Sequence, residues 1–138
     1  MLFRSVSLME NNSLIFVNTQ NGNYSNIQLN QGSNVLYREA VIDDSENIYL
    51  FKNEYQAPNY TRKIVKINKS TGSEILISSL GIGSPKCSGM IFDKENNEIL
   101  CIMEENIINI VKIDNGNYTE LQLNNNSIIR YRDLCIAK

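Results

Sequence analysis

The stretch NGNYSNIQLNQGSNVLYR at residues 21–38 recurs without a gap at residues 115–132 as NGNYTELQLNNNSIIRYR. The two strings are identical at 10 of 18 positions, and most of the differences are conservative. Self-similarity of this kind indicates that a chain repeats one supersecondary unit. The repeat therefore decides the fold class before any single motif is considered.

Short apolar runs alternate with turn clusters along the whole chain. The runs are rich in Ile, Val, Leu, Tyr and Phe, which favour strands, and the turns are rich in Asn, Gly and Asp, which tolerate tight backbone conformations. No window sustains the 3.6-residue apolar period of a helix. The sequence therefore predicts an all-β protein with strands that include Leu14–Val17, Ile48–Phe51, Ile64–Ile67, Ile75–Ile77, Met90–Phe92, Ile99–Met103 and Ile107–Ile113.

A pattern of strand, acidic or Asn-rich turn, and strand relates residues 5–18, 39–53 and 89–103, and residues 133–138 resemble its first strand. Taking Phe3, Tyr37, Cys87 and Tyr131 as equivalent starts gives periods of about 34, 50 and 44 residues, similar to those of four-stranded propeller blades. We expect one domain, residues 1–138, with units at residues 3–36, 37–86 and 87–130 and a terminal strand at 131–138.

The segment Ala40–Leu50, AVIDDSENIYL, resembles the blade opening of bacterial β-propellers of the NHL-repeat, lactonase-like and quinoprotein-like kind. The resemblance implies a partial β-propeller of about three four-stranded antiparallel blades, and a β-sandwich is the alternative. Complete propellers of that kind carry six or more blades, and three cannot close a ring. The chain is then a fragment of a longer protein, a unit whose copies form a homo-oligomer that closes the ring, or an open sandwich.

Composition and charge narrow the classes of partner. The net charge of −2 gives no basic footprint for nucleic acid, and no apolar run reaches the length of a membrane-spanning helix. The first residues lack the uninterrupted apolar core of a secretory signal. The three cysteines, Cys87, Cys101 and Cys135, have no CxxC spacing, which argues against a disulfide framework and a zinc site. We expect a cytoplasmic protein that binds neither nucleic acid nor membrane.

The chain contains no histidine, which removes the commonest general base, the commonest metal ligand and each histidine-dependent nucleophile arrangement. The acidic segment Asp43–Asn47 lacks the alternating spacing of a calcium loop and is interpreted as a turn. We predict no catalytic residue, no metal ligand and no cofactor, so a non-catalytic protein is favoured over an enzyme.

The repeat singles out basic and aromatic positions before the first strand of each unit. In propellers this connection lies on the face around the central channel, where side chains from successive blades converge. Guanidinium groups match carboxylate and phosphate, so these positions predict a site for an anionic ligand or an acidic peptide. Local ion pairing is the structural alternative. The predicted site consists of Arg4, Tyr37, Arg38, Lys86, Tyr131 and Arg132.

Three functions follow from these features. The first, which we favour, is a non-catalytic module that binds a protein or a small anionic ligand at the channel face. The second is a fragment of a metal-dependent lactonase-like or hydrolase-like propeller enzyme. The third is a purely structural unit that associates with itself.

Overall fold

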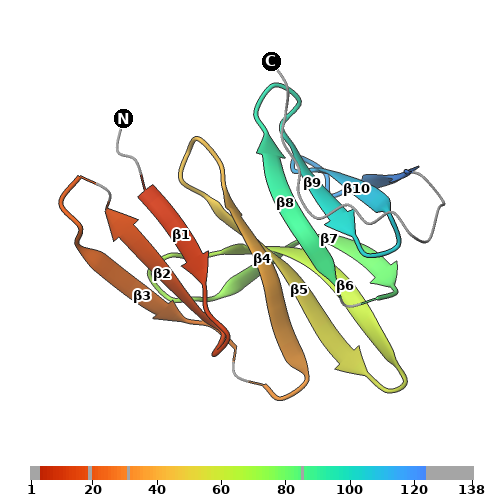
Figure 1. The fold of residues 1–138 in the computed structure, drawn as a ribbon, viewed down its shortest axis with the longest axis horizontal. Coiled ribbons are helices and arrows are strands. Elements are labelled where there is room, and N and C mark those ends of the chain that lie inside the picture. The colour runs from red at the N-terminus through yellow and green to blue at the C-terminus, as the bar shows by residue number, and fades with distance from the viewer. Residues whose placement is uncertain (1–3, 19, 31, 85, 124–138) are drawn as a thin grey trace.

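Eleven antiparallel strands make up the described part of the computed structural model, which comprises residues 4–18, 20–30, 32–84 and 86–123 (Figure 1). In chain order they are β1 (Arg4–Leu8), β2 (Ser13–Asn18), β3 (Tyr24–Gln28), β4 (Val35–Ile42), β5 (Ile48–Gln56), β6 (Asn59–Ile67), β7 (Glu74–Ile82), β8 (Cys87–Asp93), β9 (Glu98–Met103), β10 (Ile107–Lys112) and β11 (Tyr118–Gln122). These strands confirm the predicted all-β class.

The strands form three sheets in which neighbours along the chain are also neighbours in the sheet. Sheet A has the order β1-β2-β3, sheet B the order β4-β5-β6-β7 and sheet C the order β8-β9-β10-β11. Sheet B lies between sheets A and C (Figure 1). Strand β4 contacts β1 of sheet A on one side and β8 of sheet C on the other. No closed ring is formed by the described residues.

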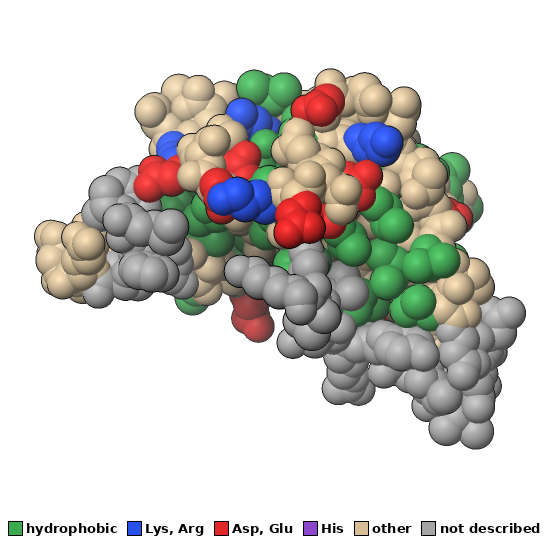
Figure 2. Space-filling view, turned by 90° about the horizontal axis from the view of Figure 1, so that it is seen from above, with side chains coloured by type: hydrophobic (Ala, Val, Ile, Leu, Met, Phe, Trp, Pro, Cys, Tyr) green, Lys and Arg blue, Asp and Glu red, His purple; other side chains and the backbone are tan. Residues whose placement is uncertain are grey.

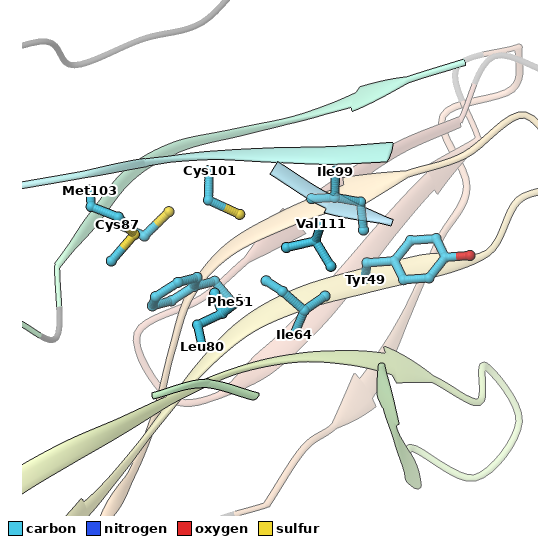
Figure 3. Packing of buried hydrophobic residues seen from close by; sticks show 9 residues of the cluster. All are labelled: Tyr49, Phe51, Ile64, Leu80, Cys87, Ile99, Cys101, Met103 and Val111. Carbon is cyan, nitrogen blue, oxygen red and sulfur yellow. The ribbon is translucent and has the colours of Figure 1, made fainter. Parts of the chain in front are cut away.

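One core fills the space between sheets B and C, because successive strand residues point to opposite faces and each of these faces is apolar. Tyr49, Phe51 and Ile64 of sheet B meet Ile99 and Met103 of sheet C (Figure 3). The remaining buried members of this cluster are Leu80, Cys87, Cys101 and Val111.

A second core lies between sheets A and B. The other face of β5, with Ile48 and Leu50, packs with Val65 and Ile67 of β6 against sheet A. Sheet A contributes Leu14, which is fully buried, and the partly buried residues Val6, Leu8 and Phe16. Sheet B is thus covered on both faces, whereas sheets A and C each pack one face on it.

Hydrogen bonds in the turns show how the sheets correspond to one another. The Gly22 amide donates to Asn18 O (2.8 Å) in the β2–β3 turn, and the Gly116 amide donates to Lys112 O (2.9 Å) in the β10–β11 turn. Both glycines have positive φ, as does Gly72 in the β6–β7 turn. Strands β2 and β3 therefore correspond to β10 and β11, and to β6 and β7.

The same correspondence continues toward the N-terminus. The Leu29 amide donates to Asn12 O (2.9 Å), and 94 residues later the Leu123 amide donates to Asn106 O (2.8 Å). Asn12 and Asn106 share a positive φ of 56° and 58°. The repeat is therefore longer than 18 residues: it joins residues 9–38 to residues 103–132, with Met-Glu-x-Asn at the start of both.

This correspondence corrects the alignment of residues 5–18 with 39–53 and 89–103. Strand β1 corresponds to β5 and β9, the second strands of their sheets, and not to the first strands β4 and β8. Asn-rich turns follow several strands of this chain, and their similar composition made two different turns look equivalent. Among the described residues, sheet A therefore has no strand that corresponds to β4 or β8, the first strands of sheets B and C.

No helix among the described residues is both long and apolar enough to cross a membrane.

Candidate functional site

The first strands of sheets B and C carry a β-bulge at matching positions. Tyr37 pairs with Lys52 and Glu39 with Phe51, which leaves Arg38 as the extra residue of β4. In β8, Ser88 is the extra residue between the pairs Cys87–Met103 and Gly89–Ile102. A bulge turns its extra side chain away from the regular alternation of the strand. Arg38 is exposed, and no ion pair joins it to another described residue.

Tyr37 is buried and belongs to the structure between sheets A and B. Its hydroxyl donates a hydrogen bond to Glu74 Oε1, and its ring lies 6.0 Å from Lys52 Nζ. Burial first, and then the Glu74 carboxylate, raise the pKa of Tyr37 well above its ordinary value. The Tyr37 side chain thus makes its contacts inside the fold, with Glu74 and Lys52, and not at the predicted ligand site.

Lys52 is the centre of a buried ionic cluster that sequence reasoning missed. Its side chain is only 6% exposed, and Nζ lies 2.8 Å from Glu54 Oε1 and 2.6 Å from Glu74 Oε2. Lys63 Nζ contacts the second Glu54 oxygen at 2.5 Å. Hydrogen bonds from Lys52 and Lys63 lower the pKa of Glu54. Burial alone would lower the pKa of Lys52, but the bonds to Glu54 and Glu74 outweigh it and raise that pKa.

The other predicted site residues that are described, Arg4 and Lys86, belong to other segments of the chain than Arg38. Lys86 is exposed and its Nζ lies 2.8 Å from Glu104 Oε1, so a local ion pair holds it. Arg4 begins β1 and therefore occupies a second-strand position that is not equivalent to Arg38. Tyr131 and Arg132 lie outside the described residues, and the repeat makes them the equivalents of Tyr37 and Arg38.

The acidic segment Asp43–Asn47 is the turn between β4 and β5. One Asp43 oxygen accepts the amides of Ser45 (2.9 Å) and Asn47 (2.8 Å), and the other accepts Asn47 Nδ2 (2.7 Å) and the Tyr49 hydroxyl (3.1 Å). Burial opposes ionisation here, but these donors outweigh it and lower the pKa of Asp43. The Asp43 carboxylate thus stabilises the turn through these hydrogen bonds.

Charges of both signs are mixed on the face that carries this turn. Figure 2, seen from above the view of Figure 1, shows acidic and basic side chains next to one another. Lys69 pairs with Glu46 at 3.2 Å, and Lys94 pairs with Asp44 across sheets B and C. The described charges on this face therefore do not form a patch of a single sign.

A groove of about 840 Å³ runs between sheet A and the β4–β5 turn. Phe16 and Tyr24 line it from sheet A, and Asp44 and Glu46 line it from the turn. The sequence carries no signal for it, since the groove depends on how far apart two sheets lie. Among the described residues, no group of three Cys, Asp or Glu side chains could hold a metal ion.

Neither a protein-family model nor a curated protein sequence matches this chain.

Proposed function

We propose that this protein is a propeller-type, non-catalytic module that binds an anionic ligand at the first strands of its sheets. Face-to-face packing of consecutive antiparallel sheets and the meeting of β1, β4 and β8 support the propeller arrangement. In that arrangement β4 and β8 line the central axis. The proposal concerns the class of protein and the chemistry of its ligand, and it names no specific ligand.

The single observation that carries the ligand proposal is Arg38. It is an exposed arginine on a bulge of a first strand. The repeat places Arg132 at the corresponding position 94 residues later, and Ser88 occupies this position in the intervening sheet C. A guanidinium forms paired hydrogen bonds with carboxylate or phosphate oxygens, so two such positions around one axis favour a ligand with several anionic groups. Tyr37 and Lys86 support the fold in this proposal and do not contact the ligand.

Titration calorimetry with citrate, inorganic pyrophosphate and a hexaglutamate peptide tests the proposal and separates small anions from acidic peptides. We expect at least one to bind, and Arg38→Ala to weaken that binding by about 10- to 100-fold, as loss of a charge-assisted hydrogen bond would. Lys112→Ala is the matched control, because Lys112 is exposed on β10 and its loss changes the net charge equally. Absence of binding, or equal effects of the two variants, would refute the proposal.

A further inference from the structure

One edge of β1 has no partner strand among the described residues. Strand β9, its equivalent in sheet C, pairs with β8 on one edge and β10 on the other, and β5 likewise pairs with β4 and β6. Within the described part of the chain, β1 pairs with β2 and with no other strand. This unpaired edge of β1 is equivalent to the edges of β5 and β9 that pair with the first strands β4 and β8.

The repeat identifies the sequence suited to this edge. Residues 129–136, IRYRDLCI, follow residues 35–42 by 94 positions, and residues 35–42 form β4, the first strand of sheet B. Residues 129–136 therefore have the sequence of a first strand. Together with the eleven described strands, such a strand would make twelve, which is three four-stranded sheets.

The outer face of sheet C indicates on which side this strand belongs. Sheet A packs on sheet B through Val6, Leu8, Leu14 and Phe16. The residues 94 positions later are all apolar, and they lie on the face of sheet C that is turned away from sheet B: Leu100, Ile102, Ile108 and Ile110. On this face Ile102 and Ile108 are buried, whereas Leu121, which pairs with Ile108, is 51% exposed. We therefore expect a further sheet to pack here, as sheet B packs on sheet A.

The chain's own β1 is out of reach of residues 129–136 on this side. Six residues connect β3 to β4, residues 29–34, and carry the chain from sheet A to sheet B. The equivalent residues 123–128 span at most about 20 Å when fully extended. Residues 29–34 lead from sheet A to the neighbouring sheet B, so by the repeat their equivalents would lead from sheet C to a sheet on its outer face, whereas β1 belongs to sheet A on the far side of sheet B (Figure 1).

We propose that residues 129–136 of a second copy of this chain add to the free edge of β1 as an antiparallel first strand. Reciprocal exchange between two copies makes every sheet four-stranded and joins six sheets. The free edge of β1, which would otherwise be open to uncontrolled pairing, is covered. The new sheet also lies against the apolar outer face of sheet C of the copy that donates the strand. The proposal rests on the repeat and on strand pairing and is independent of any ligand.

The repeat also sets the register of the exchanged strand. Val41 pairs with Tyr49 in sheet B, and Ile91 pairs with Leu100 in sheet C. Cys135 follows Val41 by 94 residues, and Val6 precedes Leu100 by 94 residues. Cys135 of one copy is therefore opposite Val6 of the other, with both side chains on the same face of the sheet.

Introducing a cysteine at position 6 tests both the partner and the register. We expect Val6→Cys to form a covalent dimer with a short thiol cross-linker or under mild oxidation, with most of the protein linked. Two matched controls should remain unlinked. Val6→Cys combined with Cys135→Ser lacks the native thiol, and Ser7→Cys places the new thiol on the opposite face of β1.

A cross-link within one chain would contradict the second copy, and equal linking of Ser7→Cys would contradict the register. If Val6→Cys does not fold, hydrogen exchange on the unaltered protein decides the question. The proposal requires the amides on the free edge of β1 to be protected like those of β9, and to lose protection on dilution. Rapid exchange of these amides at high concentration would overturn it.

Discussion

Replacing Lys52 with methionine is expected to lower the free energy of unfolding by about 2–4 kcal/mol, since removal of one partner leaves the other charges of a buried cluster without compensation. Lys52 is almost fully buried and lies within 3 Å of both Glu54 and Glu74. Methionine keeps the length of the side chain, so the loss reports mainly on the charge. Urea unfolding, followed at one fixed protein concentration, measures the change.

Lys69→Met is the matched control for this experiment. Lys69 also pairs with a glutamate, Glu46 at 3.2 Å, but 39% of its side chain is exposed. Exposed pairs of this kind contribute about 0–1 kcal/mol, so its loss should change the free energy of unfolding little. Equal effects of Lys52→Met and Lys69→Met would contradict the description of the Lys52 cluster as buried and mutually dependent.

Gly116→Ala is expected to destabilise the protein by about 2–4 kcal/mol, because strain at positive φ adds to steric overlap with backbone atoms. Gly116 has a φ of 71°, and a Cβ there would overlap the Ile77 carbonyl oxygen of sheet B. The glycine thus lets the β10–β11 turn of sheet C lie directly on β7. Urea unfolding again provides the measurement.

The repeat supplies a control for this prediction in the same chain. Gly22 has the same backbone conformation, with a φ of 73°, but no atom lies within 4 Å of an added Cβ. Gly22→Ala should therefore cost only the conformational part, about 1 kcal/mol. If the two substitutions were equally harmful, contact between the turn and the neighbouring sheet would not be the reason for the glycine at position 116.

The strands and their class could be predicted from the sequence, but the correspondence between the strands of sheet A and those of sheets B and C could not. Short apolar runs such as Leu14–Val17 and Ile99–Met103 marked strands correctly, because they are rich in residue types that favour strands. The alignment of the units failed because Asn-rich turns of similar composition follow strands at different positions in the sheets. The backbone hydrogen bonds of Asn12 and Asn106, together with those of the glycine turns, distinguished these turns.

The candidate site was predictable to a smaller extent. The repeat selected Arg38 correctly as a position on the first strand of a sheet, but it gave no sign of the bulge that exposes Arg38. It also selected Tyr37, whose hydroxyl reaches Glu74 at a separation of 37 residues. Lys52 on β5 pairs with Glu74 on β7, which is two strands away in sheet B and 22 residues away in the sequence, so the pair leaves no local pattern.

The absolute mass in solution, measured by light scattering over a range of protein concentrations, tests most directly whether two copies complete each other. We expect a closed dimer, with about twice the chain mass of 15.7 kDa and no further growth as concentration rises. A particle of 15.7 kDa at every concentration, or open-ended growth, would contradict it.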